Sequence, residues 1–199
     1  MFNFRKLWLA AVLAAGAIPS HAEPRRVDSA VFELQQTVSG QTLQLNGAGV
    51  RKKLFIKVYA AALYSPQPIR SVAQVWASPG PKRFKVVALR GIDAASLGKA
   101  MSQTMSDNLP KERLSACIPG LLKMGDIFSK VKHLAAGDSF MLDDVPGQGT
   151  VVAVNDQTVA VIEGSSFFGC LMYNYFGEHP ADATLKQNLL EPDADSTAK

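Results

Sequence analysis

The sequence predicts an α+β fold in which helices cover one face of a large, mostly antiparallel β-sheet. Strand-like segments come first, helical segments follow, and then strands and helices return, an order typical of this class. Two pairs of β-rich segments are joined by short turns, at Ser39-Gly40 and Asn155-Asp156, as in antiparallel hairpins. Between these hairpins, apolar residues recur with a helical period over residues 97–109.

The 199-residue chain is expected to hold one domain with a shorter segment on either side. Residues 1–22 have the basic start, apolar middle and Ser20-His21-Ala22 end of a secretory signal peptide, which predicts a periplasmic or secreted protein. The apolar run is shorter than the about 20 residues that span a bilayer, so no stable membrane insertion is expected. Residues 23–190 form the domain, and residues 191–199 are polar and acidic, as in a disordered tail.

Charge and motif content argue against several classes of partner. The chain has 21 Lys and Arg against 17 Asp and Glu, and Arg5 and Lys6 belong to the signal peptide, so no nucleic-acid partner is implied. His133 and His179 lie far apart without clustered cysteines, which gives no metal signature. The glycines of 47–49 lack the following helix of a dinucleotide site, and no cofactor is expected.

The first half of the domain is expected to be mainly β. Residues 31–45 form the first hairpin, and residues 54–64 alternate without giving a polar face, which predicts a central strand covered on both sides. The alanines of this strand leave space that either a packed helix or a ligand can fill, and in proteins a packed helix fills such space more often. A short helix at 71–77 and a strand at 82–89 follow.

Two longer helical patterns occupy the middle of the chain. Asp93 is a suitable N-cap for the first, whose apolar stripe includes Leu97 and Met101. The second begins at Pro110, and Pro119-Gly120 is expected to interrupt it before a new helix starts.

The last third returns to strands and then to helices. Strands are expected at 139–142, 149–154 and 157–162. Asp143-Asp144 is expected to lie in a solvent-exposed loop before Pro146-Gly147. Two helices end the domain, one capped by Ser165 or Ser166 and stopped at Gly177, the other opened by Asp182.

Cys117 and Cys170 leave two interpretations open. An oxidising compartment allows them to form a disulfide. Each also lies beside an aliphatic residue in a helical pattern, where cysteine commonly serves as a small hydrophobe.

Arg51 is the most informative candidate for a binding residue. Its guanidinium can hold a carboxylate in a two-pronged fork, and the Tyr59 phenol would add an uncharged donor at the end of an apolar slot. The alternative, and the default for basic residues near turns, is that Arg51 with Lys52-Lys53 only protects a strand edge from pairing. Along a straight strand the pair would lie about 26 Å apart, so a shared ligand requires a turn near Lys52-Lys53.

Three stretches of the chain resemble the bacterial branch of the chalcone isomerase-like family. They are LNGAGVRKKLFIKVYAAALY at 45–64, the segment 143–155, and the segment 166–177. The likeness extends from about residue 31 to residue 190, in the order that the family shows. It implies an open-faced β-sandwich, with a large antiparallel sheet backed by helices and a cleft between them.

The resemblance also implies roles for the candidate residues. Arg51 stands where plant chalcone isomerases have a substrate-positioning arginine. Tyr59 replaces their threonine, as in the related non-enzymatic branch, where an arginine and a tyrosine hold a fatty-acid carboxylate. The enzymes' further tyrosine is absent from residues 94–108, and Asn108 lies far along that helix.

The sequence is therefore interpreted as an exported, non-catalytic protein that binds a small apolar carboxylic acid or phenolic ligand. Arg51 and Tyr59 would contact the acid group, and Ala61, Leu97 and Met101 would line the cleft. One alternative is a chalcone isomerase-type intramolecular lyase, with Arg51 stabilising an oxyanion. The other is a structural or assembly factor without a ligand.

Overall fold

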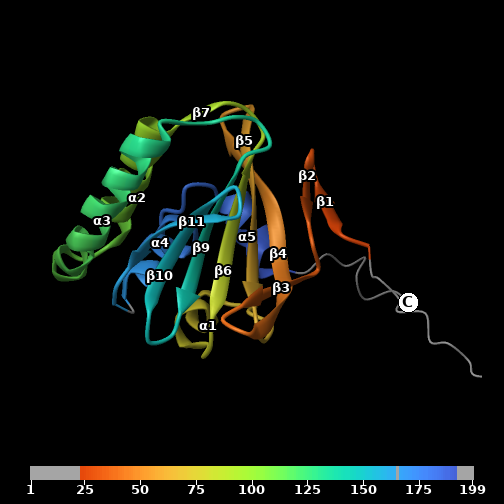
Figure 1. Cartoon of the computed structure of the whole chain (residues 1–199), viewed down its shortest axis with the longest axis horizontal. Helices are drawn as coiled ribbons and strands as arrows, with labels where there is room; N and C mark the ends of the chain where they lie inside the picture. Colours follow the sequence, from red (N-terminus) through yellow and green to blue (C-terminus); the bar gives the residue numbers. More distant parts are fainter. Residues whose placement is uncertain (1–22, 165, 192–199) are drawn as a thin grey trace, which may run out of the picture.

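The computed structural model describes residues 23–164 and 166–191, which form a curled seven-stranded antiparallel sheet and five helices (Figure 1). This arrangement confirms the predicted α+β class. The expected signal peptide at 1–22 and all but the first residue of the expected tail at 191–199 lie outside the described residues.

The main sheet has the strand order β11-β10-β9-β6-β5-β4-β3, and every neighbouring pair is antiparallel. Two small pairs, β1 with β2 and β7 with β8, lie outside it. The predicted turns at Ser39-Gly40 and Asn155-Asp156 are confirmed, and they join β3 to β4 and β10 to β11. The first hairpin begins later than the predicted residue 31, because Val31 and Phe32 belong to β2, which pairs with β1. The strands are β1 Arg25–Val27, β2 Ala30–Phe32, β3 Gln35–Val38, β4 Gln41–Lys53, β5 Ile56–Ser65, β6 Lys82–Ala88, β7 Ile92–Asp93, β8 His133–Leu134, β9 Ser139–Val145, β10 Gly149–Val154 and β11 Gln157–Ile162.

The helices lie on one side of the sheet, and α2 and α3 extend beyond its edge as an antiparallel pair (Figure 1). Their bounds are α1 Val72–Ala77, α2 Ala94–Asn108, α3 Lys111–Val131, α4 Ser166–Phe176 and α5 Ala183–Leu190. Asp93 and Asp182 act as N-caps as predicted, since their carboxylates accept hydrogen bonds from the backbone N–H groups of Ser96 and Leu185 at 2.7 and 3.0 Å.

Strand β5 runs through the middle of the sheet and is covered on both faces, as its lack of a polar face predicted. One set of alternate residues, including Tyr59, Ala61 and Leu63, enters the large core under the helices. The other set, including Ala60 and Ala62, enters a smaller core beneath the β1–β2 hairpin.

A helix, and not a ligand, fills the space beside the small residues of β4 and β5. Helix α5 packs on β4 so closely that a side chain at Gly47 or Gly49 would collide with Asn188. The bulged Asn46 between these strands donates to the carbonyl oxygens of Ile69 and Leu189 at 2.8 and 2.7 Å. The glycines therefore allow the helix to approach the sheet.

Helix α3 is continuous, so the predicted interruption at Pro119-Gly120 is wrong. Pro119 removes one intrahelical donor, but the buried face of the helix, which includes Met124 and Phe128, holds it against its neighbours. Gly120 has a packing role, because any side chain there would overlap the ring of Phe167 on α4.

The expected loop position of Asp143-Asp144 is also wrong, because both residues lie within β9. Their partners are on β6: both Asp143 oxygens accept from Arg83 at 2.7 Å, and Lys82 Nζ lies 3.6 Å from Asp144. Burial raises the pKa of the Asp144 carboxyl, and the nearby Lys82 opposes this shift. The prediction failed because the cations that pair with these carboxylates come from β6, which is distant in the sequence.

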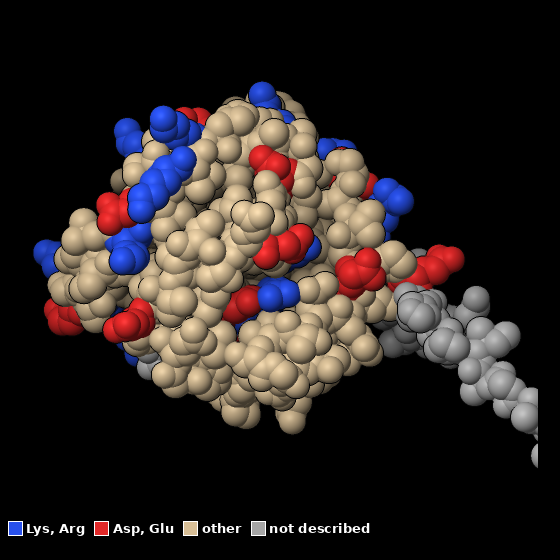
Figure 2. Space-filling model, viewed as in Figure 1, with Lys and Arg blue, Asp and Glu red and all other residues tan. Residues whose placement is uncertain are grey.

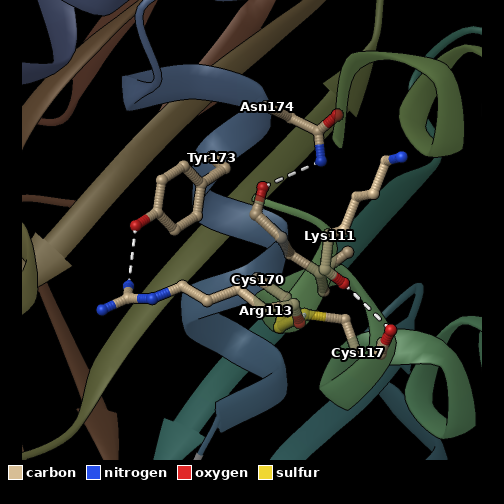
Figure 3. Close-up of a disulfide and its surroundings, with 8 residues drawn as sticks. Lys111, Arg113, Cys117, Cys170, Tyr173 and Asn174 are labelled. Atoms are coloured by element: carbon tan, nitrogen blue, oxygen red, sulfur yellow. Dashed lines mark hydrogen bonds between the residues drawn. A yellow bond between two sulfur atoms is a disulfide. The ribbon is translucent and has the colours of Figure 1, made fainter. Parts of the chain in front are cut away.

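Cys117 and Cys170 form a disulfide that joins α3 to α4, with their Cα atoms 6.2 Å apart (Figure 3). One turn away along α3, Arg113 donates to the Tyr173 hydroxyl at 2.9 Å. The Tyr173 ring stacks on Trp76 of α1, with centroids 4.7 Å apart. The sequence allowed Cys117 and Cys170 to be either a disulfide or two separate small hydrophobes, and the structure shows the disulfide.

Candidate functional site

The β4–β5 hairpin brings Arg51 and Tyr59 together. The chain turns at Leu54-Phe55, where Leu54 adopts a left-handed φ of 55°, and Arg51 and Tyr59 become direct partners across the two strands. The guanidinium carbon lies 5.6 Å from the centroid of the Tyr59 ring, within the range of a cation–π contact. The turn that a shared ligand requires is present, close to Lys52-Lys53.

The Arg51 guanidinium is half-buried and keeps its hydrogen-bonding capacity free. Within residues 23–164 and 166–191, its side chain forms no hydrogen bond and no ion pair. The neighbouring Asp182 carboxylate is occupied elsewhere, since it accepts from the backbone N–H groups of Leu185 and Lys52, the latter at 2.8 Å. A partly buried guanidinium without an anion is able to receive one from a ligand.

A second tyrosine, Tyr175 of α4, faces Tyr59. Their hydroxyl oxygens are 3.4 Å apart, and both side chains are buried. Burial raises the pKa of each phenol, and the nearby Arg51 only partly offsets this effect. Both phenols are therefore neutral at physiological pH and can act as hydrogen-bond donors.

These groups line a small cavity between β4, β5, α2 and α4. Its volume is about 40 Å³, enough for only a few water molecules. The Asn174 side-chain oxygen is buried and accepts no hydrogen bond from the described part of the chain. The lining residues are Arg51, Tyr59, Leu97, Ala100, Met101, Thr104, Asn174, Tyr175 and Ala181.

A mostly apolar groove of about 270 Å³ lies between α2 and α3. Met101 lines both this groove and the small cavity, so the two spaces adjoin at its side chain. The other groove residues include Gly98, Leu121, Met124 and Phe128. A polar end and an apolar slot therefore lie on either side of one methionine.

The structure brings four of the five predicted contact residues to one cavity. Arg51, Tyr59, Leu97 and Met101 line it, whereas Ala61 is completely buried in the core under the helices and lines neither space. The predicted cleft position of Ala61 is wrong, because core packing fills the space beside the alanines of β5.

A larger hollow, of about 550 Å³, lies between α3 and the edge strand β11. Its lining includes Lys123, Asp126 and Lys130, and none of the predicted site residues. Because these three charged side chains are all exposed, they form no buried polar end for a ligand, and the size of the hollow alone does not make it the better candidate.

The described residues contain no group of three or more His, Cys, Asp and Glu side chains placed to hold a metal ion. His133 and His179 are both exposed. No helix in 23–164 or 166–191 is long and apolar enough to cross a bilayer.

The two buried phenols lead to a prediction about pH. We expect the free energy of unfolding to fall as the pH rises above about 10, where tyrosines of the unfolded chain ionise. The pKa values of the Tyr59 and Tyr175 phenols are raised in the folded state. Their contribution to the free energy of unfolding is therefore complete below the pKa of tyrosine in the unfolded chain, and it is lost as the pH rises toward the pKa of the folded state. Urea denaturation from about pH 8 to about pH 11 measures the effect. Tyr59→Phe should make this dependence less steep without removing it, because burial also raises the pKa of Tyr175 and of the buried Tyr64. An unchanged slope in the variant would contradict the assignment.

Comparisons with known proteins agree with the observed fold. A family model described as chalcone isomerase-like matches residues 25–191. The crystal structure of a fatty-acid binding protein of Arabidopsis thaliana is similar, with a TM-score of 0.62 and 18% sequence identity, over 80% of this chain and 91% of that chain. At this identity the likeness shows the fold alone. No curated protein matches the sequence.

Proposed function

Because the chain belongs to the chalcone isomerase-like family, we propose that it binds a small apolar carboxylic acid, such as a fatty acid, without transforming it. The observation that carries this proposal is the half-buried Arg51 guanidinium, which has no anionic partner in the described chain and lines a cavity with two neutral phenols. The description of the Arabidopsis neighbour as a fatty-acid binding protein supports the same class of ligand.

The polar end of the site suits a carboxylate. The Arg51 guanidinium can donate two parallel hydrogen bonds to the carboxylate oxygens, and charge-assisted bonds of this kind are stronger than neutral ones. Tyr59 and Tyr175 supply further donors without adding charge. Partial burial strengthens these interactions because water competes less for the ligand.

The ligand's tail requires more room than the small cavity offers. The adjoining groove between α2 and α3 is mostly apolar, and its volume of about 270 Å³ lies just below the usual range of ligand pockets, about 300–1,000 Å³. Met101 lies between the two spaces, and methionine side chains adopt new rotamers at little cost. We infer that a change of the Met101 rotamer opens the groove to the acid-binding end.

The experiment that tests the proposal is displacement of a fluorescent fatty acid from the purified protein. Arg51→Ala should weaken binding by about 10- to 100-fold, because hydrogen bonds to charged groups contribute about 1.5–3 kcal/mol. The affinity of Arg51→Lys should lie between those of the wild type and Arg51→Ala, since lysine keeps the positive charge but cannot donate two parallel hydrogen bonds to one carboxylate. Arg26→Ala, an exposed arginine on β1, is the matched control and should bind as the wild type does. Equal affinity of Arg51→Ala and the control would refute the proposed head site.

Met101 provides a separate test of the tail site. We expect Met101→Trp to fill the space between cavity and groove and to weaken binding of long-chain acids more than that of short-chain acids. Leu122→Trp, on the exposed side of α3, is the control. If the variant showed no dependence on chain length, the tail would lie elsewhere.

An isomerase remains the second candidate, and one observation favours it. A tyrosine and an asparagine do reach the cavity, Tyr175 and Asn174, although from α4 and not from α2. Turnover of a chalcone by the wild type, abolished in Arg51→Ala, would replace the carrier proposal with the enzymatic one.

The proposal includes export to the periplasm or secretion, because residues 1–22 have the pattern of a signal peptide. Mass spectrometry of the protein recovered from the producing cells should find these residues removed. An intact N-terminus would contradict export by this route.

A further inference from the structure

The turn between β4 and β5 places two large apolar side chains in water. Leu54 and Phe55 are 85% and 98% exposed, and the following Ile56 is 49% exposed. We call residues 52–57 the apex of the hairpin. Isolated apolar residues on a surface are common, but three consecutive ones at a strand turn form a small projecting patch.

The local conformation gives no reason for these residues. Leu54 adopts a φ of 55°, and a two-residue hairpin turn in which only the first central residue has a positive φ prefers glycine at that residue. Leucine at position 54 is therefore unfavourable for the turn, and the exposure of both Leu54 and Phe55 is unfavourable for solvation. No core residue of the described chain buries them, so the fold does not explain their presence.

Positive charge surrounds the apolar patch. Lys52, Lys53 and Lys57 are exposed at the apex, and Lys57 lies 2.6 Å from Asp28. Within residues 23–164 and 166–191, the ammonium groups of Lys52 and Lys53 form no ion pair. Figure 2 shows lysine and arginine side chains at the upper end of the molecule, where Figure 1 places the start of β5, and a larger group on the left over α2 and α3. Apolar side chains flanked by free lysines are the combination that enters the interface of an anionic bilayer.

We propose that the apex docks on the surface of an anionic lipid bilayer. Leu54 and Phe55 enter the headgroup region, while Lys52 and Lys53 contact lipid phosphates. The apex stands at the end of two long hydrogen-bonded strands of the central sheet, so it presents a fixed surface. A protein partner would require a larger apolar area than this two-residue turn supplies.

The docked position has a consequence for the proposed ligand site. Arg51 directly precedes the apex in β4, and its strand partner Tyr59 follows the apex in β5. Docking therefore brings Arg51, which lines the small cavity, close to the layer in which apolar acids dissolve. This consequence rests on the proposed function, whereas the docking itself is independent of it.

The test is co-sedimentation of the protein, without added fatty acid, with vesicles of phosphatidylglycerol and phosphatidylcholine. The wild type should bind these vesicles, bind pure phosphatidylcholine vesicles at least about tenfold more weakly, and dissociate at high salt. The double variant Leu54→Gly/Phe55→Asn, which puts glycine at the position of positive φ, should remain folded and lose vesicle binding by at least about tenfold. Lys52→Glu/Lys53→Glu should lose binding to a similar extent.

Leu122→Asn is the matched control, because Leu122 is an exposed apolar residue (68%) on α3, and it should bind vesicles as the wild type does. No vesicle binding by the wild type, or equal binding by Leu54→Gly/Phe55→Asn, would overturn the proposal. A dimer in solution that this double variant disrupts would also overturn it, since the apex would then be a protein contact. The same variants should bind a fatty acid in solution as the wild type does, so a failure of vesicle docking can be told apart from a failure of the proposed Arg51 site.

Discussion

Loss of the Cys117–Cys170 disulfide is expected to lower the free energy of unfolding by about 4 kcal/mol. The bond closes a loop with a sequence separation of 53 residues, and in the chain-entropy model a loop of this length restricts the unfolded chain by that amount. Domains of this size are stable by only about 5–15 kcal/mol, so the loss would be a large part of the total. The measurement is urea denaturation with and without a reducing agent.

The double variant Cys117→Ala/Cys170→Ala separates this effect from general action of the reductant. It should unfold at the same urea concentration as the reduced wild type, and the reducing agent should not change it further. A difference of less than about 1 kcal/mol between the oxidised and reduced wild type would contradict the prediction.

Asp143→Ala is expected to destabilise the protein by about 3–5 kcal/mol, because it leaves the buried Arg83 guanidinium without its carboxylate. The side chains of Arg83 and Asp143 are only 14% and 12% exposed. The hydrogen bond to Asp143 is also the main cause that raises the pKa of Arg83. Gln36, which accepts from Arg83 at 2.7 Å, carries no charge and cannot replace the carboxylate.

Removal of both charges provides the control for this prediction. Arg83→Met/Asp143→Leu should be more stable than Asp143→Ala, because neither variant residue leaves a buried charge. Thermal and urea denaturation of the two variants measure the difference. A loss of less than about 1 kcal/mol in Asp143→Ala, or a double variant no better than the single one, would show that water solvates Arg83.

The fold class was predictable because its signals are local. The turn chemistry at Ser39-Gly40 and Asn155-Asp156, the helix caps at Asp93 and Asp182, and the two-sided apolar pattern of β5 each act within a few residues. The predicted interruption at Pro119 was wrong because it also used only a local signal. Proline tends to break a helix, but the packing of α3 on α4 outweighs this effect.

The site was only partly predictable, because its members come from distant elements. Arg51 and Tyr59 could be proposed together, since a single turn connects their strands. Tyr175 and Asn174 looked like ordinary members of an apolar helix, and only the approach of α4 to β5 brings them to the cavity. The unused acceptor on Asn174 has no signal in the sequence, because hydrogen-bond satisfaction depends on the whole fold.

The central claim is that the Arg51 guanidinium receives the carboxylate of an apolar ligand. Calorimetric titration of the wild-type protein with a long-chain fatty acid and with its methyl ester tests this claim most directly. The two compounds share the tail, and the ester lacks the charge that Arg51 would bind. The account predicts that the acid binds at least about tenfold more tightly than the ester. Equal affinities, or no binding of the acid, would contradict it.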